Sequence, residues 1–164
     1  MKFRRYASRG AMIVAGAWAT GGYAASCLVS AGAIGFGTYD PLLPAHDDSS
    51  TTIVVTCSYT GPAASEVVGY TLSLSAGTGS YAARTLLRGT SVMTYNLHAS
   101  PSRDASSIWG DGTGGSVTVS ASLPVLTSSN PVRLVNHTVY GRIPARQDLP
   151  VGTYVASVLL TMTY

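Results

Sequence analysis

The last thirteen residues of the chain, GTYVASVLLTMTY, constrain its fold more than any other stretch. Even positions hold aromatic or aliphatic side chains, whereas odd positions mix apolar residues with serine and threonine. This period-two pattern over about eleven residues predicts a β-strand with one strongly apolar face. A strand of this length also needs cover along its backbone edge, because an unpaired edge tends to pair with other chains. The side chains expected on the apolar face are Tyr154, Ala156, Val158, Leu160, Met162 and Tyr164.

The same alternation recurs along the chain, with turn signals every 8 to 15 residues or so. Glycine, serine and threonine are abundant, and no stretch keeps a helical period of 3.6. This spacing is typical of an antiparallel β-sandwich with Greek-key crossings. Three strands have a clear inward face. The inward residues are Ile53, Val55 and Cys57 in the first, Tyr70, Leu72 and Leu74 in the second, and Met93, Tyr95 and Leu97 in the third. Thr94, Asn96 and His98 are expected on the opposite face of the third strand.

The first 24 residues have the features of a secretory signal peptide. Lys2, Arg4, Arg5 and Arg9 precede a short apolar run, and small residues follow it. The run is too short and wrongly flanked for a membrane span, so no span is expected after cleavage. We expect cleavage after Ala24 or Ala25, although the segment 15–17 also offers a site. The predicted mature chain, residues 25–164, is one domain.

Cleavage changes the charge of the chain. The remaining part has no lysine, and its six scattered arginines face seven acidic residues, a net charge of about −1. Nucleic acids and anionic membranes are recognised by clustered positive charge. Both are therefore disfavoured as partners.

Cys27 and Cys57 both survive cleavage, and an even number of cysteines in an exported chain predicts one disulfide. The disulfide would close a loop of about 31 residues, worth about 3–4 kcal/mol in the chain-entropy model. A catalytic or metal-binding thiol is the alternative. It is disfavoured because the chain has neither a C-x-x-C motif nor a histidine close to either cysteine in the sequence.

Residues with catalytic or metal-binding chemistry are few and dispersed. Asp47, Asp48 and Asp111 lie in turn-like segments, and Glu66 is the one glutamate. The three histidines, His46, His98 and His137, lack the spacing of metal ligands. We therefore predict a protein that is not an enzyme and that has no metal and no cofactor.

Aromatic residues in or next to loops offer a different kind of site. Trp109, with Tyr59 and Tyr81, is a candidate for stacking on a sugar or contacting an apolar surface. Packing of these rings on the end of the sandwich is the alternative, and the sequence leaves both open.

Several stretches together resemble the spore coat protein U domain family, which includes subunits of archaic chaperone–usher pili. The resemblance runs over essentially the whole predicted mature chain, in the order C…FGxYDP, TVxCS, YNL, WGDG and YGRIPA-Q…GTY. The stretches that carry it are CLVSAGAIGFGTYDPL, TTIVVTCS, GYTLSLSAG, RTLLRG with MTYNLHA, IWGDGTGG, VYGRIPARQDLPVGTY and the terminal strand.

The resemblance implies an all-β, immunoglobulin-like sandwich that lacks its last strand. A periplasmic chaperone would first fill the resulting groove with one of its own strands, engaging the backbone edge of 152–164 and its terminal carboxylate. At the outer-membrane usher, a strand from a neighbouring subunit would replace it, which is donor-strand complementation. The expected location is the surface of a Gram-negative bacterium, reached through the periplasm.

Three functions are to be weighed, two that follow from the resemblance and one from another class. Ahead of Cys27, cleavage leaves Ala25 and Ser26, or at most WATGGYAAS, and neither is a long apolar donor strand. A strand-accepting tip, cap or minor pilus subunit for adhesion or biofilm formation is therefore expected first. A cell-surface or spore coat protein that forms no fibre is second. A small periplasmic ligand-binding or enzymatic sandwich is third.

Overall fold

The computed structural model describes residues 2–6, 25–61 and 65–164. This part is all-β apart from one 3₁₀ turn, η1 (Ala105–Ser107), and it contains no helix that is long and apolar enough to cross a membrane. The strands are β1 (Lys2–Tyr6), β2 (Ala25–Ala31), β3 (Asp47–Tyr59), β4 (Ser65–Glu66), β5 (Gly69–Leu74), β6 (Arg84–Arg88), β7 (Ser91–His98), β8 (Val119–Ser122), β9 (Leu126–Thr127), β10 (Val132–Ile143) and β11 (Ser157–Thr163).

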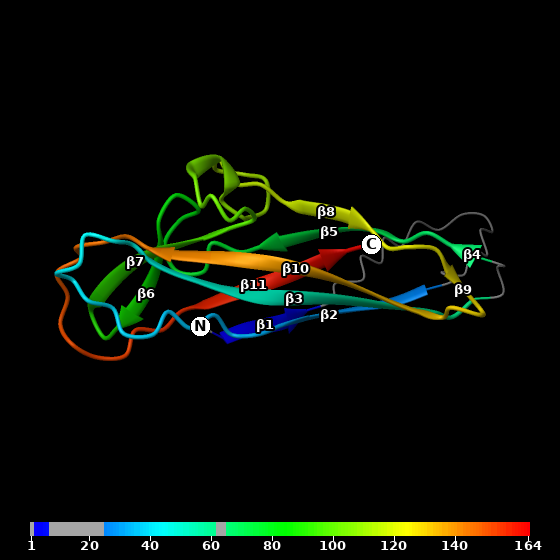
Figure 1. Cartoon of the computed structure of the whole chain (residues 1–164), viewed down its shortest axis with the longest axis horizontal. Coiled ribbons are helices and arrows are strands. Elements are labelled where there is room, and N and C mark those ends of the chain that lie inside the picture. The colour runs from blue at the N-terminus through cyan, green and yellow to red at the C-terminus, as the bar shows by residue number, and fades with distance from the viewer. Residues whose placement is uncertain (1, 7–24, 62–64) are drawn as a thin grey trace, which may run out of the picture.

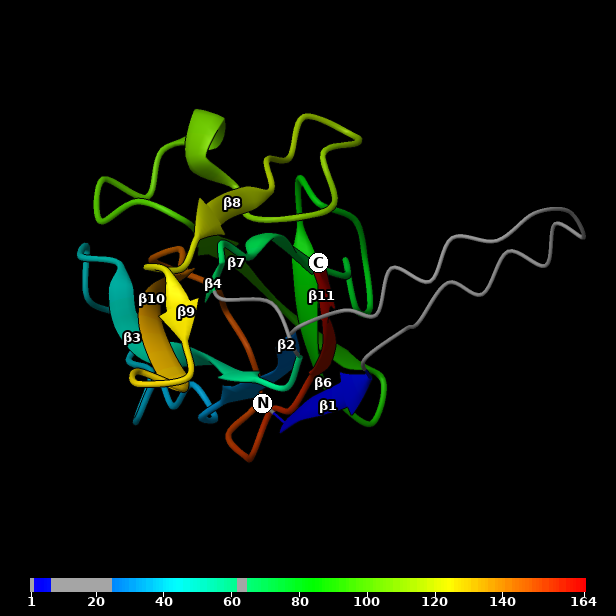
Figure 2. The same cartoon turned by 90° about the vertical axis from the view of Figure 1, so that its right-hand side faces the viewer.

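Two sheets pack face to face. One has the strand order β2-β3-β10-β7-β6 and the other β1-β11-β5-β8, while β4 and β9 form a small separate pair. The long strands run along the length of the molecule (Figure 1), and the end-on view separates β3 and β10 from β11 (Figure 2). The all-β, immunoglobulin-like sandwich expected from the sequence is thus confirmed.

The centre of the core follows the alternation of the long strands. β3 and β10 pair antiparallel from Asp47 opposite Ile143 to Ser58 opposite Val132. The side chains predicted to face inward on β3, β5 and β7 are all buried, with only their alternate neighbours reaching the surface. Because successive side chains of a strand point to opposite faces, nine inward residues on three strands close one continuous core.

The β6–β7 hairpin shows how a turn sets this register. Arg88 lies opposite Ser91, so only Gly89 and Thr90 form the turn. Gly89 has φ 57°, a left-handed conformation that glycine adopts without steric cost. The turn places Leu86 opposite Met93, and both side chains are buried.

The predicted disulfide is confirmed. Cys27 on β2 lies directly opposite Cys57 on β3, and their sulfur atoms are bonded. Both side chains are buried in the core. The disulfide therefore joins the edge strand β2 to the central part of its sheet.

One expectation at the chain ends differs from the structure, and the other is not tested by it. The last strand, expected from Gly152, is hydrogen-bonded as β11 only from Ser157. The preceding residues instead bond to β6 and β7, and Pro150 has no N–H to donate to a ladder. Most of the predicted signal peptide lies outside the described residues, but Lys2–Tyr6 form β1.

Candidate functional site

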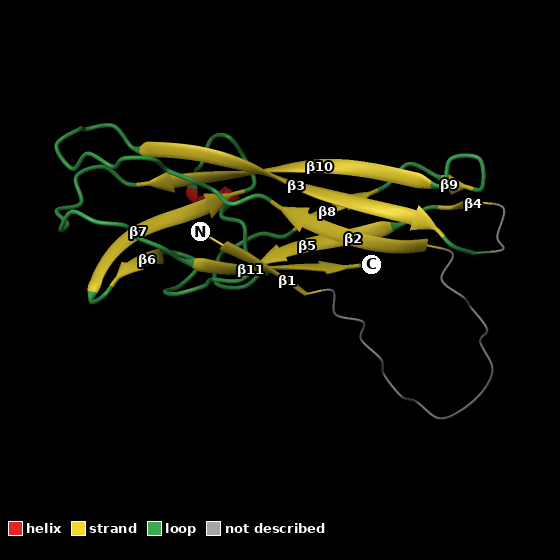
Figure 3. Ribbon diagram, turned by 90° about the horizontal axis from the view of Figure 1, so that it is seen from below, coloured by secondary structure: helices red, strands yellow, loops and turns green. Residues whose placement is uncertain are grey.

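The edge of β11 that faces away from β5 is the main feature of the candidate site. One edge of β11 pairs antiparallel with β5, from Leu160 opposite Leu74 to Thr163 opposite Thr71. The other edge pairs with β1, which runs parallel to it, with Lys2 opposite Ser157 and Tyr6 opposite Thr161. We call this second edge, along 157–161, the acceptor lane. Figure 3 shows β1 lying along β11, and β1 also contacts β2 of the other sheet.

Five of the six side chains predicted for the apolar face of the last strand are buried or half-buried. Ala156, Val158, Leu160 and Met162 are buried, and Tyr154 is half-buried. Tyr164 is 40% exposed and lies at the end of the row. A strand placed in the acceptor lane therefore lies beside an apolar row that continues into the core.

Tyr164 links β11 to β2 of the opposite sheet, beside the acceptor lane. Its phenol oxygen accepts a hydrogen bond of 3.3 Å from the backbone N–H of Cys27 on β2. Cys27 is in turn bonded to Cys57 of β3. One end of the lane is thus fixed by a side-chain bridge from β11 to β2 and by the disulfide behind it.

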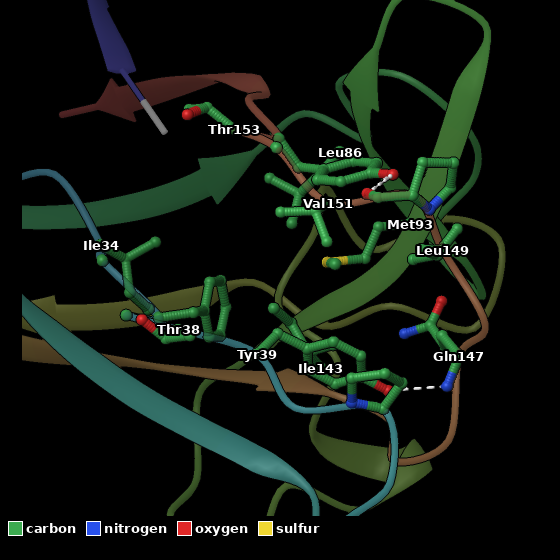
Figure 4. A pocket seen from close by; sticks show the side chains of 17 residues that line it. Ile34, Thr38, Tyr39, Leu86, Met93, Ile143, Gln147, Leu149, Val151 and Thr153 are labelled. Atoms are coloured by element: carbon green, nitrogen blue, oxygen red, sulfur yellow. Dashed lines mark hydrogen bonds between the residues drawn. The ribbon is translucent and has the colours of Figure 1, made fainter.

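A cavity of about 530 Å³ opens at the other end of the lane, where β11 begins. We call it the end pocket. Its walls come from the segment after β2, from β6 and β7, and from the segment that leads into β11 (Figure 4). The apolar side chains that line it include Ile34, Phe36, Leu86, Met93, Ile143, Leu149 and Val151.

The segment between the end pocket and β11 is anchored to the opposite sheet. Val155 and Leu87 exchange two backbone hydrogen bonds, of 2.8 and 3.1 Å. These bonds occupy the outer edge of β6, which would otherwise be unpaired at this point. Thr153 and Tyr154 line the end pocket just before this anchor, and the acceptor lane begins just after it. Adjacent stretches of the chain therefore form the end pocket and the lane.

The prediction that Trp109 offers a surface contact is wrong. Its side chain is 1% exposed, and its indole N–H donates to the carbonyl of Leu72 at 3.2 Å. Its backbone N–H and carbonyl also bond to Leu97 and Arg84. Trp109 therefore packs in the core and ties its loop to β5, β6 and β7, as the alternative reading held, while Tyr59 and Tyr81 are half-buried.

The histidines lie apart and serve different contacts. His46 Nδ1 accepts the N–H of Ala145, at 3.2 Å. His137 Nε2 is 2.7 Å from the hydroxyl of Tyr70 on the facing sheet. His98 was expected on the outward face of its strand, but it is 5% exposed because the loop around η1 covers it. Across the residues that the structure describes, no group of three His, Cys, Asp or Glu could hold a metal ion.

Burial of two histidines predicts loss of stability in mild acid. Desolvation lowers the pKa of His98 and of His137 below their ordinary value of 6.5. The unfolded chain therefore takes up these protons near pH 6.5, and the folded chain only at lower pH. The stabilisation is complete above about pH 6.5 and decreases as pH falls towards the folded-state pKa. Urea unfolding at about pH 7.5 and about pH 5.5 should give a lower free energy of unfolding at the acidic value.

The double variant H98Q/H137Q provides the control for this pH dependence. It removes both titrating groups and should flatten the decrease between the two pH values, whatever its own stability. An unchanged pH dependence in the variant would contradict the assignment to these histidines.

One comparison with known proteins identifies a family. Residues 18–161 match the family model described as the Spore Coat Protein U domain. No curated protein matches the chain. The matched region takes in β2 to the greater part of β11, and thus the disulfide, the end pocket and the acceptor lane.

Proposed function

The chain belongs to the Spore Coat Protein U domain family. From this premise we propose that it is an exported structural subunit of a chaperone–usher surface assembly, completed by a strand that another protein supplies. The observation that carries the proposal is the pairing of β1 with the acceptor lane of β11. A strand with no hairpin connection to β11 occupies that edge, and this pairing supports the proposal that the edge receives an added strand.

Removal of the predicted signal peptide would take β1 away with it. The polar backbone groups along 157–161 that now pair with β1 would then lack partners beside a row of apolar side chains. Such an edge favours pairing with another chain. An added strand would restore the ladder, and each of its apolar side chains that became fully buried would contribute about 1.5–3 kcal/mol.

A periplasmic chaperone is the proposed first donor, and a neighbouring subunit that replaces it at the outer-membrane usher is the second. The mature protein would then reside at the cell surface of a Gram-negative bacterium. Within the assembly, a tip, cap or minor subunit that serves adhesion or biofilm formation is the proposed role.

The family description favours a second candidate, a coat protein. In this version the chain is exported and completed in the same way but is deposited on the cell or spore surface without forming a fibre. Immunogold electron microscopy separates the two candidates. Label at fibre ends supports the pilus subunit, whereas label spread over the surface with no fibres supports the coat protein.

Expression in the periplasm, with and without the chaperone, tests the shared part of both candidates. We expect the processed chain to be recovered as a complex with the chaperone and to be degraded or to aggregate without it. Its recovery without the chaperone as a stable, soluble monomer would contradict the proposal. The gene of the full chain, leader included, is used in both arms.

A further inference from the structure

The side chain of Gln147 pairs with β7 as a neighbouring strand would. Its Oε1 accepts the backbone N–H and the hydroxyl of Thr94, both at 2.7 Å. Its Nε2 donates to the carbonyls of Thr94 and Pro144, at 2.9 and 3.2 Å. The amide therefore satisfies both backbone groups of Thr94 and fixes the start of the segment that leads to β11.

Tyr39 adds the third segment to this arrangement. Its hydroxyl donates to the carbonyl of Pro144 at 2.9 Å and accepts the backbone N–H of Gln147 at 2.7 Å. The bond between Tyr39 and Gln147 is drawn in Figure 4. We call Tyr39 and Gln147 the clasp, because together they join the segment after β2, the segment after β10 and β7.

The clasp stands at the wall of the end pocket. Both of its members line the pocket, and so do all the residues from Leu149 to Tyr154 on the chain that follows. Beyond the clasp, this stretch is anchored at Val155 by its backbone bonds to Leu87. Between those two anchors, the side-chain bond from Tyr154 to the carbonyl of Pro150 is internal to the stretch. The hydrogen bonds of the clasp therefore fix the position of this wall of the end pocket.

We propose that Tyr39 and Gln147 are positioning residues, which hold the end pocket open so that it selects the strand entering the acceptor lane. The inference rests on the proposed function. β1 reaches only Ser157, with Lys2 opposite it. A parallel strand extended by about four residues at its N-terminal end would reach Thr153, where the pocket lies. An apolar side chain on that extension would then enter the pocket, whose walls are largely apolar.

Peptide binding to the full chain tests this inference. Three fluorescein-labelled peptides of alternating valine and threonine are compared by anisotropy: a five-residue peptide matched to the lane, a nine-residue peptide extended at its N-terminal end, and the same nine-residue peptide with glycine for the valine opposite the pocket. All three must displace β1. We expect the nine-residue peptide to bind about tenfold or more tightly than its glycine variant.

The variants Q147L and Y39F should reduce this preference to about one and leave the affinity of the five-residue peptide unchanged. Y39F removes only a hydroxyl, so the test remains available if Q147L does not fold. The matched control is Y70F, which removes the hydroxyl that bonds to His137 on the facing strand. Y70F should lower the melting temperature but keep the tenfold preference. If the clasp only stabilised the fold, Y39F would behave like Y70F and would also keep the preference.

Two results would overturn the inference in different ways. If the nine-residue peptide binds the wild type with its preference and Q147L and Y39F keep that preference, the clasp does not position the pocket, and the proposed function stands. If no peptide binds the wild-type chain, the proposed function falls and the inference falls with it.

Discussion

Replacing Arg84 by methionine should lower the free energy of unfolding by about 3 kcal/mol or more, although methionine keeps the unbranched apolar stem of the side chain. Arg84 is 0% exposed on β6. Its guanidinium donates to the carbonyls of Ser75 and Trp109 and to the side-chain oxygen of Asn96, at 2.6–3.2 Å. Methionine would leave the carbonyls of Ser75 and Trp109 without this donor and Asn96 Oδ1 with the N–H of Leu97 alone, and each unsatisfied buried group costs about 1–3 kcal/mol.

The charge of Arg84 has no ionic partner in the described residues. Burial lowers the pKa of the guanidinium, and the neutral oxygens around it, together with the ring of Tyr81, stabilise the cation instead. Because these partners come from four different segments, Arg84 holds the loop that carries Trp109 against β6 and β7. Trp109 fluorescence during urea unfolding therefore reports the loss directly.

Arg88 on the same strand is the matched control. It is exposed, so R88M should change the free energy of unfolding by only about 0.5 kcal/mol. Equal losses in R84M and R88M would contradict the structural role of Arg84. They would mean that the substitutions act through strand propensity or net charge.

Removing the disulfide should cost about 3–4 kcal/mol of folding stability. The double variant C27A/C57A avoids a free thiol and releases a closed loop with a sequence separation of 30 residues. Cys27 lies on β2, next to the acceptor lane, and its N–H holds Tyr164. Loss of the disulfide should therefore loosen the wall of the lane as well as the core. Urea unfolding of the variant, compared with the oxidised wild type, measures the cost.

The neighbouring cross-strand pair controls for the substitutions themselves. Ser26 lies opposite Ser58 on the same two strands, and no covalent bond joins them. S26A/S58A should change stability by only about 0.5 kcal/mol. If C27A/C57A were no less stable than S26A/S58A, the disulfide would not be what secures β2.

The sequence predicted the faces of the strands well because alternation is a local property. Tyr70, Leu72 and Leu74 are buried as expected, and so are the corresponding residues of β3 and β7. Alternation predicts only which residues share a face. It does not show which outward faces are covered by loops, and this is why His98 was expected to lie outward.

The sequence did not decide the buried positions of Trp109 and Arg84, for the same physical reason. An aromatic residue in a glycine-rich loop resembles a recognition group, and an isolated arginine resembles a solvated one. Both are buried because the loop that carries Trp109 folds back over the core, where the indole N–H donates to Leu72 of β5 and the carbonyl of Trp109 accepts from Arg84. Such partners are not encoded by spacing along the chain.

The two parts of the candidate site differ in how far the sequence predicts them. The acceptor lane lies on one continuous strand. Its alternation and its resemblance to the family can both be recognised from the sequence. The end pocket is assembled from segments around Ile34, Leu86 and Leu149, which are far apart in the sequence. Tyr39 and Gln147 both lie in stretches that carry the family resemblance, FGTYDP and YGRIPARQDLPVGTY, but spacing along the chain does not show that these stretches meet.

Amide hydrogen exchange along β11 tests the central claim most directly. The processed chain is compared alone and in complex with a protein that supplies a strand, and exchange is followed for the amides of Ser157–Thr163. We predict that the amides of 157–161 that do not bond to β5 exchange rapidly in the isolated chain and are protected in the complex. Equal protection of these amides in the isolated, soluble chain would contradict the claim that β11 is completed by another protein.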